Sequence, residues 1–327
     1  MNLSEWKERN KKAKKYAHFD TRTTLDNVWS YISNPIKVEK HSFYPFIHYE
    51  KNFNKFKDGK VIPKCRELCY SAHIDRYIFS YYGYLLNEKY NQILADKGIE
   101  EVAIAYRNNL FKNNIHFAKK AFDTIRKLEK CYIMIGDFTS FFDQLDHMYL
   151  KERLCEVLEV EKLPPDYYAV YKNITKYAKV ELEHLLMINN LPINDRGIEE
   201  LKSKKQVLTL TEFRKAKRAN PKFITKNQKG YGIPQGSAIS AVLSNIYMIK
   251  YDEQINQLVT KRGGTYLRYS DDFIIILPGT QEDFREVYGE IECIRKSVPR
   301  LDLQKEKTQI FIYNEKELKN INSFISV

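Results

Sequence analysis

The sequence predicts an α+β protein in which a small antiparallel β-sheet carries helices on one face. Four short apolar runs, at 131–138, 266–269, 273–277 and 308–313, are rich in β-branched and aromatic residues, which is typical of strands. Between them and before them, apolar residues return every three or four positions, as on the buried side of a helix. Strand and helix units that alternate around a hairpin indicate one sheet layer packed against helices.

The first 130 residues are predicted to be mostly helical. Apolar residues recur at helical spacing in 24–34, again in 74–94, and again in 113–130. A strand follows at 131–138 and ends in Gly136 and Asp137. A helix is predicted after it, because Leu150, Leu154 and Val157 fall on one helical stripe.

The last hundred residues complete the predicted sheet. The stretch "GYGIPQGSAISAVLSNIYM" from Gly230 predicts a Gly/Pro turn followed by a helix, with Ser237 as its N-cap. The runs 266–269 and 273–277 form a predicted hairpin. A helix is expected over 282–296, and the last strand over 308–313.

Composition narrows the functional classes. The chain has 327 residues, of which 43% are hydrophobic, so it can bury a real core. Its net charge of +12 fits a polyanionic partner such as nucleic acid. The five cysteines form no C-x-x-C pair, and no run reaches the roughly 18 apolar residues of a membrane span. We therefore expect a protein of the reducing cytoplasm with no membrane partner.

One segment concentrates the positive charge. Ten Lys or Arg residues stand between Lys202 and Lys229 against a single acid, Glu212. Such a run is either a solvated face or a contact for a nucleic-acid backbone.

Three acids lie at predicted strand ends. Asp271 and Asp272 stand between two apolar strands, where neighbouring carboxylates repel each other unless a tight turn brings them to a shared cation. Asp137 ends another buried strand. Acids that meet across a sheet can hold two Mg²⁺ ions about 3.5–4 Å apart, the arrangement used in phosphoryl transfer. The alternative for Asp271 and Asp272 alone is an ordinary polar turn.

The context of these acids resembles a known family. "DFTSFFDQLDH" from Asp137, "GIPQGSAISAVLSNIYM" from Gly232 and "YSDD" before Phe273 occur in the order of motifs A, B and C of reverse transcriptases. The chain resembles the bacterial enzymes from "HSFYPFI" at His41 to "LQKEKTQIF" at Leu303. "AHIDRYIFSYY", "AYRNN", "NITKYAKV" and "LRYSDD" are most similar to the abortive-infection and defence-associated (unknown-group) members. Retron and group II intron-like enzymes are the alternative subgroup; this chain differs from them by the serine in Y-S-D-D, where they usually have alanine.

The resemblance implies a right-hand polymerase fold. The palm, an antiparallel sheet with helices, would comprise 131–165 with motif A and 230–327 with motifs B, C and D. Largely helical fingers would comprise 1–130 and the basic insert 166–229. The helical thumb of the family is expected to be absent or truncated, or to be supplied by another subunit or the RNA.

The resemblance also implies roles for individual residues. Asp137 and Asp271 would bind two Mg²⁺ ions, or Mn²⁺, together with the carbonyl of Phe138, and Asp272 would assist them. Phe142 would be the steric gate that favours dNTPs over rNTPs, whereas Phe141 is assigned to the core. Lys307 matches the motif D lysine that neutralises the leaving pyrophosphate. The remaining expected contacts to the dNTP and the template are Gln235, Gly236, Lys64, Arg66 and Arg107.

The function implied is RNA-directed DNA synthesis from dNTPs, templated by a dedicated non-coding RNA in anti-phage defence. The partners would be that RNA template, the DNA product, and a second subunit or partner protein. Two alternatives stay open from the sequence. One is template-independent DNA synthesis, which needs the same acids, and the other is a non-catalytic RNA-binding scaffold.

Overall fold

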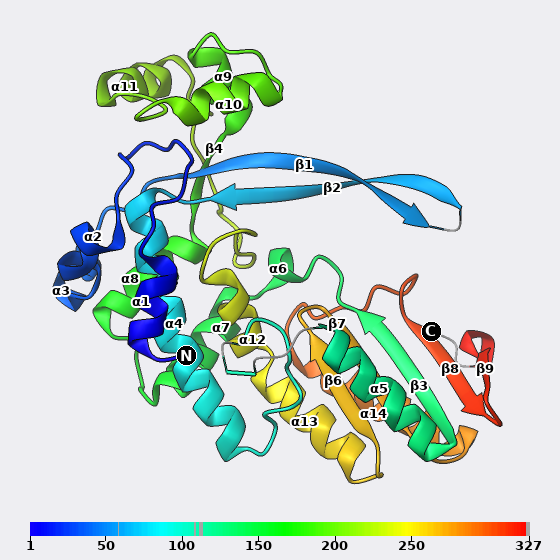
Figure 1. Cartoon of the computed structure of the whole chain (residues 1–327). Helices are drawn as coiled ribbons and strands as arrows, with labels where there is room; N and C mark the ends of the chain where they lie inside the picture. The colour runs from blue at the N-terminus through cyan, green and yellow to red at the C-terminus, as the bar shows by residue number, and fades with distance from the viewer. Residues whose placement is uncertain (58, 108, 111–113, 325–327) are drawn as a thin grey trace. The chain divides into compact units, whose positions relative to one another are not determined.

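The computed structural model describes residues 1–57, 59–107, 109–110 and 114–324. The chain divides into two compact units. Unit 1 comprises Met1–Leu85 and Lys162–Ser240, and unit 2 comprises Leu86–Glu161 and Ala241–Val327 (Figure 1). Within the described residues no helix is long and apolar enough to cross a membrane.

Unit 1 combines a four-stranded sheet with short helices. The sheet has the order β2-β1-β4-β5, in which β1 pairs antiparallel with β2 and parallel with β4. Its strands are β1 (Phe46–Lys57), β2 (Lys60–Tyr70), β4 (Ala178–Glu181) and β5 (Thr225–Lys226). The helices are α1 (Leu3–Asn10), α2 (Leu25–Ile32), α3 (Pro35–Glu39), α8 (Pro165–Thr175), α9 (Leu182–Ile188), α10 (Asp195–Ser203) and α11 (Leu210–Ala219). The long helix α4 (His73–Asp96) begins in unit 1 and ends in unit 2.

The expectation that the first 130 residues are mostly helical is wrong in one respect. The predicted helices are present as α2, α4 and α5, although Asn113, the predicted first residue of α5, lies outside the described residues. The region between α3 and α4, however, forms the long β1–β2 ribbon (Figure 1). Most side chains of this ribbon are exposed, so its sequence has no apolar face from which a strand could be recognised.

Unit 2 is built on a five-stranded antiparallel sheet of order β6-β7-β3-β8-β9. The strands are β3 (Lys130–Asp137), β6 (Thr265–Tyr269), β7 (Asp272–Leu277), β8 (Gln309–Asn314) and β9 (Glu317–Asn320). The helices are α5 (Asn114–Leu128), α6 (Phe141–Gln144), α7 (His147–Leu158), α12 (Ser240–Tyr247, which starts at the end of unit 1), α13 (Ile249–Thr260) and α14 (Gln281–Ser297), followed by the 3₁₀ turn η1 (Asn322–Phe324). The predicted strands and helices of this region are confirmed within one or two residues.

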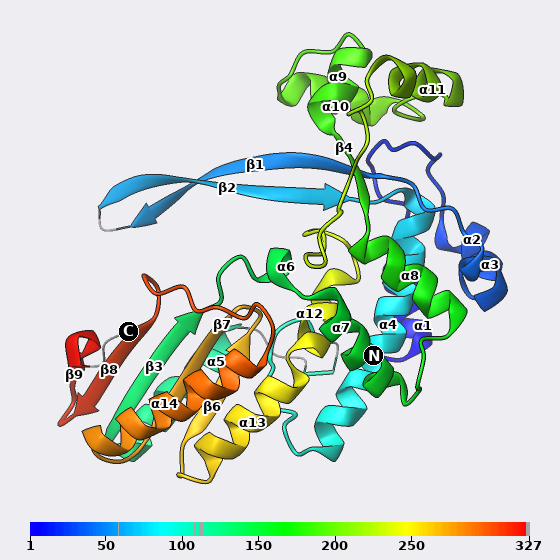
Figure 2. The same cartoon turned by 180° about the vertical axis from the view of Figure 1, so that it is seen from behind.

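Helices cover both faces of this sheet, so the prediction of helices on one face is wrong. Helices α13 and α14 lie on one face and α5 lies on the other, as the two opposite views agree (Figures 1 and 2). Apolar side chains explain the α5 layer: Phe117 and Ala121 of this helix pack with Cys131 and Ile133 of the central strand β3. The hydrophobic core of unit 2 thus continues on both sides of the sheet, which fixes β3 and the acid at its end.

Candidate active site

Asp137 is the last residue of the central strand β3. The register places Asp137 directly opposite Asp272, the first residue of β7. Just before it, Gly136 faces the ring of Phe273, and a Cβ at this glycine would lie 2.3 Å from that ring. A side chain at this position would displace the buried Phe273 ring, so glycine lets the two strands pair up to their acids with that ring in place.

Backbone hydrogen bonds hold the end of β3 from two sides. The Phe138 N–H donates to the carbonyl of Asp271 (3.1 Å), and the Gln304 N–H donates to the carbonyl of Asp137 (2.8 Å). The Thr139 N–H donates to the carbonyl of Asp302 (2.8 Å). The segment predicted as motif D therefore lies against motif A, and the turn of motif C lies on its other side.

The β6–β7 connection is a two-residue turn. Tyr269 pairs with Asp272, which leaves Ser270 and Asp271 at the tip. Ser270 has φ 60°, a left-handed conformation that is unfavourable for a residue other than glycine. The expected tight turn between the two strands is present, and the chain pays a small conformational cost to form it.

A buried ion pair stands behind this turn. Arg268 and Asp252 are both fully buried, and the guanidinium donates from Nε to Oδ1 (2.8 Å) and from Nη2 to Oδ2 (2.6 Å). Burial alone would lower the pKa of Arg268, but the adjacent Asp252 carboxylate raises it, so the arginine stays charged. Its Nη1 also donates to the carbonyl of Ser270 (2.8 Å). Arg268 is thus a positioning residue for the turn that carries Asp271.

Sequence reasoning missed this ion pair. Arg268 precedes the Y-S-D-D motif in an otherwise apolar strand, and Asp252 interrupts the apolar stripe of the preceding helix. A charged residue on each of two segments that should be buried was the available signal, since buried charges require partners.

The carboxyl of Asp272 has an unusual pKa. Although Asp272 reaches solvent, its carboxyl group is partly desolvated, and the carboxylates of Asp271 and Asp137 stand close to it. Desolvation first, and then these two negative charges, raise the pKa of Asp272 to about 6. The negative charge of these three acids is therefore not fully neutralised by the protein's own cations. Such an excess of negative charge is the electrostatic condition for a cation site.

The ammonium of Lys307 contacts one of these acids, Asp137. Its Nζ lies 2.9 Å from Oδ2 of Asp137. The neighbouring Lys305 is exposed and forms no salt bridge within the described part of the chain. The structure thus distinguishes the two lysines that the sequence left side by side.

The donor set suits Mg²⁺, although no complete set of ligands is assembled. Within the described residues, no group of three or more His, Cys, Asp or Glu stands close enough to hold a metal ion. Carboxylate and backbone carbonyl oxygens are nevertheless the ligands that Mg²⁺ prefers. The two opposed carboxylates, with the raised pKa of Asp272, therefore fit a divalent cation in chemistry, and the ligand roles of Asp137, Phe138, Asp271 and Asp272 stay predictions.

Three phenylalanines follow the acid of β3. Phe138 and Phe141 are buried, with ring centroids 6.0 Å apart, so the assignment of Phe141 to the core is confirmed. Phe142 is half-buried on α6, and its ring lies 5.7 Å from that of Phe141. Phe142 can therefore present part of its ring to a ligand, and its role as steric gate stays a prediction.

The predicted Gln235 and Gly236 lie in unit 1. The carbonyl of Gln235 accepts a hydrogen bond from the Cys69 N–H (2.7 Å). Gly236 has φ 98°, and a Cβ there would lie 2.6 Å from the Cys69 carbonyl oxygen. Glycine is needed at this position for both reasons. The expectation that Ser237 caps the next helix is wrong, because α12 begins at Ser240 and the buried Ser237 hydroxyl lacks a hydrogen-bond partner within the described residues.

The predicted triphosphate contacts have different surroundings. Lys64 and Arg66 are exposed on β2 in unit 1, and the Arg66 guanidinium lies 5.1 Å from the ring centre of Phe53. Arg107, in unit 2, donates to Asn91 Oδ1 (2.9 Å) and to the carbonyls of Ala103 (3.3 Å) and Glu100. Arg107 thus uses Nε and Nη1 to hold its own loop and α4, and its buried Nη2 has no hydrogen-bond partner within the described residues.

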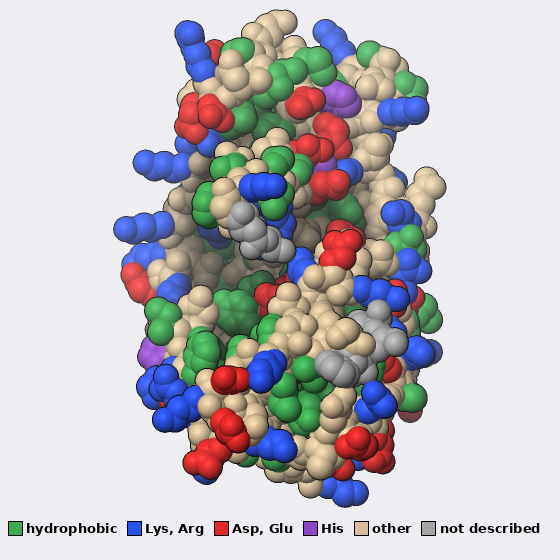
Figure 3. Space-filling model, turned by 90° about the vertical axis from the view of Figure 1, so that its right-hand side faces the viewer, with side chains coloured by type: hydrophobic (Ala, Val, Ile, Leu, Met, Phe, Trp, Pro, Cys, Tyr) green, Lys and Arg blue, Asp and Glu red, His purple; other side chains and the backbone are tan. Residues whose placement is uncertain are grey.

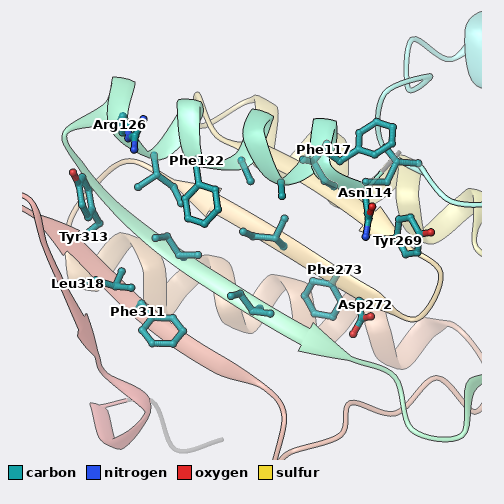
Figure 4. Close-up of a pocket in the computed structure, with 18 residues that line it drawn as sticks. Asn114, Phe117, Phe122, Arg126, Tyr269, Asp272, Phe273, Phe311, Tyr313 and Leu318 are labelled. Carbon is teal, nitrogen blue, oxygen red and sulfur yellow. The ribbon is translucent and has the colours of Figure 1, made fainter. Parts of the chain in front are cut away.

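A cavity of about 710 Å³ lies between α5 and the sheet, in unit 2. Figure 4 shows Asp272 beside Phe273 and Tyr269 at one end of it, with Phe122 and Phe311 further along. The walls are mostly apolar side chains. This surrounding explains physically why the Asp272 carboxyl is desolvated.

The sheet of unit 2, its strand-end acids and its two helical layers define the palm of a nucleic-acid polymerase. A model of the reverse transcriptase (RNA-dependent DNA polymerase) family matches residues 86–321. The chain belongs to this family. No curated protein matches it by sequence.

Solved telomerase structures are similar in fold. Apo telomerase from Candida tropicalis, truncated from its C-terminal domain, superposes with a TM-score of 0.52 at 13% identity, covering 92% of this chain and 61% of that one. Telomerase from Candida albicans with a TWJ fragment of telomeric RNA gives a TM-score of 0.46 at 14% identity, covering 96% and 52%. The chain thus spans about half to three fifths of the length of these proteins.

Proposed function

We propose that the protein is an RNA-directed DNA polymerase that adds dNTPs to a primer end by metal-assisted nucleotidyl transfer. The observation that carries this proposal is the pairing of Asp137 with Asp272 across β3 and β7, beside the turn that carries Asp271. Membership of the reverse transcriptase family supports the same reaction.

Asp137 and Asp271 are proposed as the main ligands of two Mg²⁺ ions, with the Phe138 carbonyl as a further ligand and Asp272 assisting. When bound, these ions would stabilise the attacking and leaving oxygens of the transferred phosphate. The protein's own part is to fix the acids: the backbone clamp holds the end of β3, and Arg268 holds the Ser270 carbonyl. These backbone hydrogen bonds and Arg268 hold the acids in place before substrate binds, so that reacting groups can be oriented without further rearrangement.

Lys307 is proposed to neutralise the leaving pyrophosphate. Its ammonium already lies beside the predicted metal ligand Asp137, so a phosphate bound there would lie within reach of it. Phe142 is proposed to exclude a 2′-OH, which favours dNTPs over rNTPs. Gln235, Gly236, Lys64, Arg66 and Arg107 are proposed as nucleotide or template contacts on the strength of residue type and motif resemblance.

The finer proposal concerns the biological setting. The motif resemblance supports a bacterial enzyme of the abortive-infection and defence-associated group, acting in the cytoplasm on a dedicated non-coding RNA. The net charge of +12 supports a nucleic-acid partner of this kind.

The test is incorporation of labelled dNTPs with Mg²⁺ by the protein as purified, with co-purifying RNA retained, followed by sequencing of the product. Asp271→Ala should lower incorporation by at least about a hundredfold, because a lost metal ligand removes several kcal/mol of transition-state stabilisation. Glu306→Gln is the matched control, since it removes an exposed acid from the loop next to Lys307.

Asp271-dependent product complementary to a bound RNA supports the proposal and identifies the template. Product that matches no RNA would show template-independent synthesis instead. If no dNTP is incorporated even on an added primed RNA template, the polymerase proposal is wrong and the scaffold alternative replaces it.

A further inference from the structure

Helix α11 in unit 1 presents an uncompensated cationic surface. Its outward side and the turn after it carry five exposed cations, which we call the α11 face: Arg214, Lys215, Lys217, Arg218 and Lys222. None of the five forms a salt bridge within the described part of the chain. By contrast, on the face of the molecule shown in Figure 3, Lys and Arg side chains are interspersed with Asp and Glu.

The sequence fixes this face outward. Phe213 and Ala216 pack onto the core of unit 1, and the Phe213 ring lies 5.2 Å from Phe19 and 5.8 Å from Phe223. Because the inner side is set by these contacts, residues 214, 215 and 218 fall together on the opposite side of the helix, and the exposed Lys217 lies on its flank.

The single acid of helix α11 does not offset these charges by pairing. Glu212 is used in a capping box, where its Oε2 accepts from the Thr209 N–H (2.7 Å) and from the Thr209 hydroxyl (2.8 Å). These bonds lower the pKa of Glu212, so it stays ionised in this role. The cations are left to an external anion.

The length of the α11 face and its lack of outward aromatic side chains indicate which anion it binds. A ten-residue helix is about 15 Å long, which suits several phosphates in a row. The aromatic residues of this segment, Phe213 and Phe223, are turned inward, so the face offers charge without a platform on which unstacked bases could lie. Surfaces of this type contact the backbone of duplexes by shape and charge.

We propose that the α11 face binds the phosphate backbone of a base-paired stem of RNA. This inference rests on the proposed function, in which the protein works on a structured RNA. The contact positions the RNA on unit 1 and is independent of its sequence.

The test measures binding of an RNA hairpin stem by full-length protein carrying Asp271→Ala, so that no synthesis takes place. The α11 variant combines Arg214→Gln, Lys215→Gln, Lys217→Gln and Arg218→Gln, since glutamine keeps helix propensity. A milder variant carries only Arg214→Gln and Arg218→Gln. The matched control removes the same charge from four scattered exposed lysines: Lys40→Gln, Lys89→Gln, Lys261→Gln and Lys316→Gln.

The expected result is at least about a tenfold loss of stem affinity at 0.1 M salt for the α11 variant, with its salt dependence (slope of log K against log salt) reduced by about 3. In the milder variant the slope should fall by about half as much, and the control should keep the wild-type slope. Thermal unfolding confirms that all variants are folded.

Binding of two further ligands, an unpaired RNA and a DNA duplex, is measured with the same variants. An equal loss of stem affinity in the α11 variant and the control, or no loss in either, would overturn the proposal. A larger loss for unpaired RNA than for the stem would overturn the duplex assignment, and an equal loss for a DNA duplex of the same sequence would overturn the choice of RNA. Because no dNTP is used, failure of polymerase activity leaves this result unaffected.

Discussion

The buried pair Arg268–Asp252 gives the sharpest stability prediction. Replacing Asp252 by Ala removes both acceptors of the bidentate contact and also the acceptor of the Tyr266 hydroxyl (2.9 Å). A fully buried guanidinium is left without its counter-charge. We expect a loss of about 3–5 kcal/mol in the free energy of unfolding, which lowers Tm by roughly 6–20 °C in a unit of this size.

Glu253 provides a control on the next residue of the same helix. Its ion pair with Lys97 is as short, at 2.7 Å, but its side chain is 25% exposed and that of Lys97 is 35% exposed. Glu253→Gln should therefore cost less than about 1 kcal/mol. Comparing these two variants separates the effect of burial from that of ion-pair distance.

The assay is thermal and urea unfolding followed by circular dichroism. A second variant, Arg268→Met with Asp252→Leu, replaces both charges by apolar side chains and should recover most of the lost stability. If Asp252→Ala costs no more than Glu253→Gln, the reasoning that an uncompensated buried charge dominates is refuted.

Three other predictions concern the strand-end acids and the Gln235–Gly236 turn. The pKa of Asp272, about 6, lies above the ordinary value of about 3.9. Without metal, the contribution of Asp272 to the free energy of unfolding should therefore rise as pH falls from 6 toward 4, whereas stabilisation by Mg²⁺ should be larger above pH 6. Thermal unfolding measured with and without Mg²⁺ across this pH range checks both effects. In Asp272→Asn this contribution to the pH dependence should vanish. Gly236→Ala should destabilise by roughly 2 kcal/mol or more because of its positive φ and the Cys69 carbonyl, while Gly230→Ala, where a Cβ meets open space, should be neutral in the same unfolding assay. Lys307→Gln should raise the affinity for Mn²⁺ in the absence of nucleotide, measured by electron paramagnetic resonance, and lower kcat for dNTP incorporation; unchanged Mn²⁺ affinity would show that the Lys307–Asp137 contact does not compete with metal.

The sequence predicted the sheet of unit 2 well because its strands are apolar and its helices are amphipathic. The pairing of Asp137 with the acids of motif C could be expected, since each acid follows a run that must be buried. The β1–β2 ribbon could not be found in the same way. Lys51, Lys55, Lys60 and Lys64 alternate with other exposed residues, so period-two burial, the usual sign of a strand, is missing.

Side-chain partners were harder to predict than strands. Arg268 is a residue type that usually reaches solvent, and its partner Asp252 is 16 positions away on another element. Nothing local marks the two as a pair. The choice between Lys305 and Lys307 likewise depended on where the loop before β8 places each ammonium, which only the folded chain decides.

The opposed acids of β3 and β7 repel each other, and the protein relieves part of this repulsion in two ways. Directly opposite carboxylates repel, and this repulsion is relieved by the ammonium of Lys307 on Asp137 and, below about pH 6, by a proton on Asp272, whose pKa is raised to about 6. A divalent cation that bound both acids would have to displace both. The displaced ammonium would then need another anion, which the triphosphate of a bound nucleotide would supply. Metal and nucleotide should therefore bind interdependently, with Lys307 as the group that couples them.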